Sequence, residues 1–429
     1  MIAANIGRIF LNAYNEKFNS NFTAKDFFIE KYFTLFFDHE KYMQWVTNSP
    51  FVQGIKKGVY PTLAERKLKL ETLIDKISNN TADASIAIGF PSLDLTASTS
   101  GQITSMDLPL KAEDVYLSWI GSGLGIGVQS GLSLLFSQKQ ILLDLYEGWQ
   151  LYRDFLNKTP QLRGNQINTW NGQWIAHRYN LRAYNPSHPT ASIDFFGNMK
   201  DGGMEISTQS WVKVMIGIAR TFPDASLTAY VYSLGQTNIT VGFVPFELPR
   251  IRQPFDLYAK YFGNNKRDQI EQLFGTSIGF TKACQMGAVG VNALEPKGFR
   301  ECLSKGVTPK YNSNDEDKTV NYNTYQIWLL AMLNNEQLWE KAQQFATTLN
   351  EHTLSDKNAK KVRSQEVSNL LSSVNKKQFL ESLTEIVKSS PETDRLAEIA
   401  ALVHSIPVDN VPYFLTLIRF QYAVVNKKS

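Results

Sequence analysis

The C-terminal quarter of the chain contains five successive segments in which apolar residues recur every three or four positions. This spacing places an apolar stripe along each helix, and such stripes are buried when the helices pack against one another. The polar stretch Lys310–Lys318 precedes these segments. The segments are Tyr325–Asn350, Asn358–Leu371, Lys376–Ser389, Thr393–Ser405 and Val411–Val425. The sequence therefore predicts a helical bundle over residues 320–429, attached to a separate body over residues 1–310.

Within residues 1–310 the predicted secondary structure changes along the chain. Residues 1–77 are predicted to be mainly helical, with one helix capped at Thr23 and another running from Thr62 to Ile77. Residues 84–249 contain short β-rich runs bounded by Gly, Asn, Pro and Ser, which are typical of strands. The runs are Ser85–Ile88, Trp174–Leu181, Ser192–Phe196, Leu227–Tyr232 and Ile239–Phe246.

Two helical segments, Gln138–Asn157 and Ser210–Thr221, interrupt the β-rich part. Residues 250–310 are glycine-spotted and net basic. Strands mixed with unequally placed helices favour an α+β fold over a doubly wound parallel sheet. We therefore expect an α+β protein in which a mixed helical and β-rich N-terminal body precedes the C-terminal helical bundle.

Composition sets limits on the class of protein. A hydrophobic fraction of 43% and a charged fraction of 20% are those of a globular chain, and the net charge of +4 permits a nucleic-acid partner without requiring one. The two cysteines, Cys284 and Cys302, are too few for a disulfide framework. With no signal peptide and no apolar run long enough to cross a bilayer, the sequence predicts a cytoplasmic protein without a membrane partner.

The glycine-rich stretch Gly121–Gly127 follows a possible strand, Val115–Ile120, and so invites comparison with phosphate-binding loops. The dinucleotide pattern needs glycine where Ile126 stands, and a P-loop needs a lysine that the following residues do not supply. We interpret the stretch as a packing element that lets another segment approach closely. The five histidines lack the spacing of a zinc site, so neither a metal nor a cofactor is expected.

One acidic pair allows an enzymatic alternative. Asp194 and Glu205 flank a glycine-rich segment in the manner of a two-carboxylate nuclease centre. Such a centre normally has a lysine two residues after the second acid, and Ser207 stands there instead. A metal-dependent nuclease is therefore kept as the alternative to a protein without catalytic activity.

The segment Arg163–Trp174 combines one cation, several amide side chains and two tryptophans. Amides both donate and accept hydrogen bonds, so they suit base edges in the minor groove of DNA. We predict that Asn165, Gln166 and Asn168 read a DNA motif and that Arg163 contacts the backbone. The alternative is a polar loop anchored by buried tryptophans.

Further cations gather at three places and are predicted to contact the nucleic-acid backbone. They are Arg250 and Arg252, then Lys297 and Arg300, and finally Lys357, Lys360, Lys361 and Arg363. The last group stands near a predicted helix start, where cations oppose the helix macrodipole, which points to a role other than helix stability. The alternative for every group is solvated surface charge.

In this layout the chain resembles the large subunit of type I CRISPR surveillance complexes, the Cascade effectors, particularly the I-B-like forms. The phrases that carry the resemblance are Glu147–Arg153, Val241–Glu247, Leu273–Gly279, Gln285–Gly290, Leu294–Arg300 and Leu417–Ala423. The resemblance implies a non-catalytic subunit that recognises a protospacer-adjacent motif on duplex DNA, supports strand separation and R-loop formation, and recruits a helicase-nuclease or a transposition factor.

The resemblance also implies partners. These are target DNA, CRISPR RNA and the backbone, cap and small subunits of Cascade. The C-terminal bundle is similar to the small subunit, and in some systems that bundle is also made separately from an internal start, for which Met332 is available. A scaffold that binds only proteins, through the helical bundle, remains a third alternative.

Overall fold

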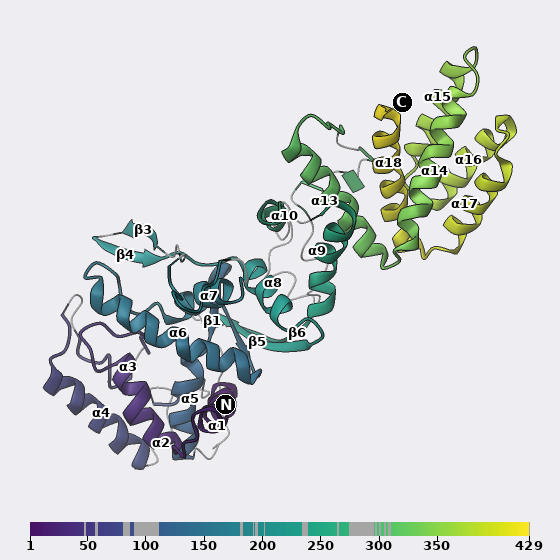
Figure 1. Ribbon diagram of the computed structural model, residues 1–429. Helices are drawn as coiled ribbons and strands as arrows, with labels where there is room; N and C mark the ends of the chain where they lie inside the picture. The colour runs from purple at the N-terminus through teal and green to yellow at the C-terminus, as the bar shows by residue number, and fades with distance from the viewer. Residues whose placement is uncertain are drawn as a thin grey trace. The chain divides into compact units, whose positions relative to one another are not determined.

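The computed structural model divides into two compact units, Met1–Leu248 and Pro249–Ser429 (Figure 1). The residues it describes are 1–46, 49–55, 59–79, 86–89, 111–180, 183–191, 193, 196–200, 202–233, 239–263, 266–273, 296, 298–299, 302–303, 306–307 and 310–428. The predicted boundary near residue 310 lies inside the second unit, because the helices that follow residue 248 pack against the C-terminal helices. Among the described residues, every helix is too short or too polar to cross a bilayer.

Local capping signals fix the first helices of unit 1. Thr23 accepts a hydrogen bond from the Asp26 N–H, and Thr62 forms a reciprocal capping box with Glu65, so both predicted helix starts are confirmed. The helical elements of unit 1 are α1 (Ile2–Phe18), α2 (Ala24–Phe27), the π-helical η1 (Phe28–Phe33), α3 (Thr34–Phe36), α4 (Leu63–Ser78), α5 (Ala112–Gly123), η2 (Gln129–Gly131), α6 (Lys139–Lys158), α7 (Ile167–Arg178) and α8 (Trp211–Thr221).

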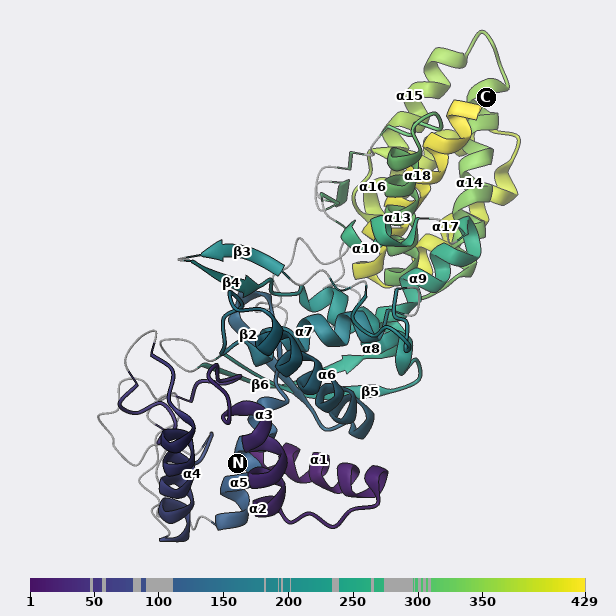
Figure 2. The ribbon, with the colours of Figure 1, turned by 60° about the vertical axis from the view of Figure 1, so that its left-hand side comes forward.

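Glycines bring α1 and α5 together (Figure 2). A Cβ atom on Gly121 would lie 1.8 Å from the Ala3 carbonyl oxygen, and one on Gly7 would lie 2.1 Å from that of Leu117. Only glycine permits this crossing, so Gly121 is the packing element that the sequence predicts. The predicted strand Val115–Ile120 is wrong, because this segment belongs to α5. Every residue from Val115 to Gly123 is buried, so its apolar run has no amphipathic period to mark it as a helix.

A four-stranded antiparallel sheet lies in the same unit, with the strand order β1-β2-β5-β6. Its strands are β1 (Ile126–Val128), β2 (Leu132–Phe136), β5 (Ser226–Ser233) and β6 (Ile239–Glu247). Ala229, Val231 and Val244 are buried on one face of the sheet. The strand pairing places Val231 opposite Leu134 and Ala229 opposite Val244, so these side chains share that face. The predicted strands Leu227–Tyr232 and Ile239–Phe246 are therefore confirmed.

Two of the other predicted strands differ from the structure where it describes them, and a third lies mostly outside the described residues. Trp174–Leu181 is wrong, because α7 continues to Arg178 and buries Trp174. Residues 86–89 form turns. Of the predicted strand Ser192–Phe196 only residues 193 and 196 are described, and Phe196 begins strand β3 (Phe196–Lys200). Strand β3 pairs with β4 (Gly203–Ile206) in a separate two-stranded sheet (Figure 2). Buried aromatic residues favour strands by propensity, and tertiary packing overrides that preference in α7.

Unit 2 is helical, as the C-terminal pattern predicts. The elements described in it are α9 (Leu248–Phe262), α10 (Arg267–Leu273), α13 (Glu316–Leu333), α14 (Gln337–Leu354), α15 (Lys360–Leu371), α16 (Lys376–Ser389), α17 (Thr393–Ser405), η4 (Val408–Asn410) and α18 (Val411–Lys428). Helix α18 packs on α14 and α13, and α9 joins them because Tyr261 stacks on Trp339 at a centroid distance of 4.6 Å. The whole is an α+β protein with a helical C-terminal part.

Candidate nucleic-acid interface

Two of the predicted motif-reading amides bind groups of their own unit. Gln166 donates from Nε2 to the Arg163 carbonyl at 2.8 Å and accepts on Oε1 from the Ile206 N–H at 2.7 Å. Asn168 donates from Nδ2 to the Ser133 hydroxyl at 3.1 Å. These bonds join the start of α7 to β4 and to β2, so the two side chains stabilise the fold.

Asn165 differs from its neighbours. Its residue is exposed, and its backbone N–H donates to the Tyr42 carbonyl at 2.7 Å. Its φ of 59° lies in the left-handed region, which asparagine tolerates better than most residues. Of the three predicted readers, Asn165 is therefore the one whose amide faces solvent.

The tryptophans of this segment are anchors inside unit 1. Trp170 and Trp174 are fully buried, and their indole N–H groups donate at 2.7 Å to the carbonyls of Gly148 and Asp144. The segment is helical from Ile167 onward, so the predicted loop is shorter than expected. Neither ring is available to stack on a base, which agrees with the alternative of an anchored polar segment.

Arg163 and Glu205 form an ion pair, with 2.8 Å between Nη1 and Oε1. The charge of Glu205 is thereby directed at Arg163, which leaves this carboxylate less suited to hold a metal ion. Asp194, the other carboxylate of the predicted nuclease pair, lies outside the described residues. In the part of the chain that the structure describes, no group of three or more His, Cys, Asp or Glu side chains could hold a metal ion.

The four predicted cations of residues 250–310 do not share one environment. Arg252 pairs with Asp256 in the same helix, with 2.6 Å between Nε and Oδ2. Arg250 is exposed near the start of α9. Lys297 and Arg300 lie outside the described residues, so their predicted role stays a prediction.

The turn between α14 and α15 and the first residues of α15 carry three exposed cations of the predicted set. Lys357, Lys360 and Lys361 are exposed, and no described carboxylate forms an ion pair with them. Helix α15 has no acidic residue in its first turn and no side-chain cap at Ala359. Its N-terminal partial positive charge therefore adds to the field of the lysines instead of cancelling it.

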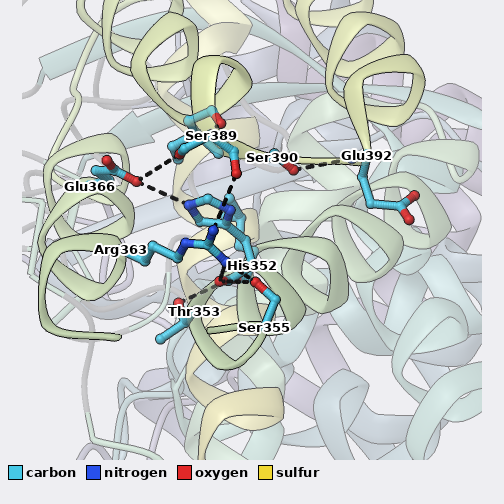
Figure 3. A network of polar contacts seen from close by, with 10 residues as sticks. His352, Thr353, Ser355, Arg363, Glu366, Ser389, Ser390 and Glu392 are labelled. Atoms are coloured by element: carbon cyan, nitrogen blue, oxygen red, sulfur yellow. Dashed lines mark hydrogen bonds and ion pairs between the residues drawn. The ribbon is translucent and has the colours of Figure 1, made fainter. Parts of the chain in front are cut away.

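Arg363, the fourth cation of this group, is engaged within the bundle (Figure 3). Its Nη1 donates to the His352 carbonyl at 3.4 Å and to the Ser355 hydroxyl, and its Nη2 donates to the Ser389 carbonyl at 3.4 Å. The sequence predicts that Arg363 contacts the nucleic-acid backbone. In the structure its guanidinium instead donates to acceptors at the ends of α14 and α16. No local pattern around Arg363 indicates those partners.

Comparisons of the chain with protein-family models, with curated protein sequences and with solved structures found no match.

Proposed function

We propose that this protein is a non-catalytic, nucleic-acid-binding subunit of an RNA-guided surveillance complex of the Cascade type. The observation that carries the proposal is the exposed lysine cluster of the α14–α15 turn, Lys357, Lys360 and Lys361, which has no described acidic partner. An α+β unit followed by a helical unit also agrees with the layout of such a subunit.

The lysine cluster suits a phosphate backbone. Lysine ammonium groups bind phosphates as mobile point charges, and each contact releases a condensed counterion, which makes affinity fall as salt rises. Cations at the start of α15 weaken that helix, so a partner that brings negative charge stabilises the turn when it binds. The predicted binding is therefore independent of sequence and sensitive to salt.

Recognition of a short motif on duplex DNA is the finer part of the proposal. Guide RNA pairing supplies most of the sequence specificity in such complexes, so the protein needs to read only a few base pairs beside the target. Asn165 is the predicted reader whose side chain is exposed. In this proposal the protein acts in the cytoplasm with target DNA, CRISPR RNA and the other Cascade subunits, supports strand separation, and recruits a helicase-nuclease or a transposition factor.

Co-purification tests the assembly. The chain, tagged and expressed with its native neighbours, is expected to bring down an RNA of uniform length. A preparation that contains other proteins but no RNA would favour a scaffold that binds proteins only. Magnesium-dependent cleavage of DNA that disappears in Asp194→Ala would contradict the non-catalytic assignment and favour the nuclease alternative.

Binding by the isolated chain tests the lysine cluster. We expect the triple variant Lys357→Gln, Lys360→Gln, Lys361→Gln to weaken binding of a fluorescein-labelled mixed-sequence DNA duplex on the order of tenfold at low salt. Fluorescence anisotropy measures this change. The matched control is Lys377→Gln with Lys388→Gln, because these lysines are exposed on α16 and each pairs with a glutamate of that helix.

A further inference from the structure

A network of polar contacts joins the α14–α15 turn to the ends of α14 and α16 (Figure 3). Arg363, in the first turns of α15, reaches the carboxyl-terminal end of α14 through the His352 carbonyl and that of α16 through the Ser389 carbonyl, both at 3.4 Å. Helix carboxyl ends carry partial negative charge and unpaired carbonyls, so a guanidinium suits this place. One side chain thus joins three helices of the bundle.

The imidazole of His352 adds a second connection between α14 and α15. Its Nε2 lies 3.0 Å from Glu366 Oε2, and the ring is almost completely buried. Glu366 also accepts a hydrogen bond from the Ser389 hydroxyl at 3.5 Å. The same carboxylate therefore contacts residues of α14 and α16, as Arg363 does.

The turn itself is held by short-range hydrogen bonds. Asp356 Oδ1 accepts from the backbone N–H groups of Asn358 at 2.9 Å and Ala359 at 3.3 Å. The Ser355 hydroxyl donates to the His352 carbonyl at 2.8 Å and accepts from Arg363. The backbone that carries the lysines is therefore fixed on both sides, by Asp356 within the turn and by Ser355 against Arg363.

We infer that Arg363 is a positioning residue: its guanidinium holds the α14–α15 turn so that Lys357, Lys360 and Lys361 meet the phosphates of a nucleic-acid strand together. This inference rests on the proposed function and replaces the role that the sequence predicts for Arg363. Arg363 does not itself contact the phosphate backbone, because its donors are directed at the ends of α14 and α16. A turn that is ordered before binding avoids the entropy loss of ordering it on the nucleic acid.

The charge-conserving variant Arg363→Lys separates positioning from direct contact. A lysine keeps the positive charge but lacks the planar, multiply donating fork that reaches several acceptors at once. If Arg363 positions the turn, Arg363→Lys weakens duplex binding by about two- to tenfold. The slope of log affinity against log salt also becomes smaller, because fewer lysines engage phosphates together. Unchanged affinity and slope would overturn the inference.

Two further variants keep the test interpretable. Ser355→Ala removes one acceptor of Arg363 without disturbing the apolar core, so we expect a smaller loss of affinity in the same direction, with the fold intact by circular dichroism. Arg395→Lys is the matched control, since Arg395 is an exposed arginine of α17 that pairs with Glu351 and Glu392. The control should bind as the unchanged protein does. A loss as large in Arg395→Lys as in Arg363→Lys would contradict a specific role for Arg363.

The outcomes distinguish this inference from the proposal beneath it. If the triple lysine variant binds the duplex as tightly as the unchanged protein, the proposed function of the cluster fails and the inference fails with it. If the triple variant loses binding while both Arg363→Lys and Ser355→Ala retain it, the lysine cluster stands and only the positioning role of Arg363 is rejected.

Discussion

In the segment Arg163–Trp174, most of the polar side chains bind groups of their own unit, whereas three lysines of the α14–α15 turn stay exposed without a described acidic partner. Both regions stand out in the sequence through their composition. They differ in whether the surrounding fold already satisfies their polar groups. A cluster of polar residues therefore indicates an interface only when packing leaves those groups accessible.

The first and largest expected effect concerns the close contact between α1 and α5 in unit 1. Gly121→Ala would place a Cβ atom 1.8 Å from the Ala3 carbonyl oxygen, and the backbone of α1 must move to relieve the clash. We expect the free energy of unfolding to fall by about 3 kcal/mol or more, measured by urea denaturation. Gly217→Ala is the milder control, because its Cβ would lie 3.2 Å from Tyr179 Cβ.

The second prediction tests whether the amides of unit 1 are structural. Gln166→Ala leaves the Ile206 N–H without its acceptor and leaves the Arg163 carbonyl with the Tyr152 hydroxyl as its donor, so stability should fall by about 1 to 3 kcal/mol. Asn165→Gly removes an exposed amide and keeps a residue that tolerates positive φ, so stability should change by less than about 0.5 kcal/mol. A stability loss in Asn165→Gly as large as in Gln166→Ala would break the distinction between these neighbours.

The third prediction concerns acid stability in unit 1. Burial and the nearby Arg153 guanidinium lower the pKa of His39 from 6.5 to about 4. Between these two pH values the unfolded chain binds more protons at His39 than the folded protein does. The contribution of neutral His39 to the free energy of unfolding is therefore complete above pH 6.5 and is lost as the pH falls toward 4. We expect His39→Gln to lose less stability than the unchanged protein across this window. The difference should be modest, because the ring is half-buried and solvent screens its charge.

That difference can be measured by urea denaturation at both ends of the window. His177 also has a lowered pKa, caused mainly by burial, and it remains in the variant, so acid sensitivity should be reduced and not abolished. An identical loss of stability in both proteins would show that His39 has an ordinary pKa in the folded state.

The smallest expected effect concerns the stability of unit 2. Lys360 and Lys361 oppose the macrodipole at the start of α15, so replacing both by glutamine should raise stability by a few tenths of a kcal/mol. Lys388 lies in the last turn of α16, where a cation is favourable, so Lys388→Gln should change stability in the opposite direction. Thermal unfolding followed by circular dichroism measures both. Equal signs for the two changes would contradict the electrostatic argument.

The parts of the fold that depend on short-range signals are predictable from the sequence. Thr23 and Thr62 mark helix starts through bonds to residues three positions away. Buried residues alternate with more accessible ones over residues 228–232 of β5 and 243–247 of β6. Helices α5 and α7 are missed because burial of nearly all their apolar residues removes the amphipathic period. Propensity then favours the wrong element for β-branched and aromatic runs.

The candidate site is predictable only in part, because some of its residues depend on partners far away in the sequence. The lysines of the turn are visible as a charge cluster, and their exposure follows from the polar residues around them. The role of Arg363 depends on where α14 and α16 end in space, and the role of Gln166 depends on Ile206, which is 40 positions away. No local pattern carries such long-range partners.

The salt dependence of duplex binding by the full chain tests the central claim most directly. Each phosphate contact with B-form DNA contributes about 0.9 to the slope of log affinity against log salt. The account predicts that the triple variant of Lys357, Lys360 and Lys361 has a slope smaller by roughly 2 to 3 than the unchanged protein. Equal slopes for the two proteins would show that these lysines contact no phosphate and would contradict the account.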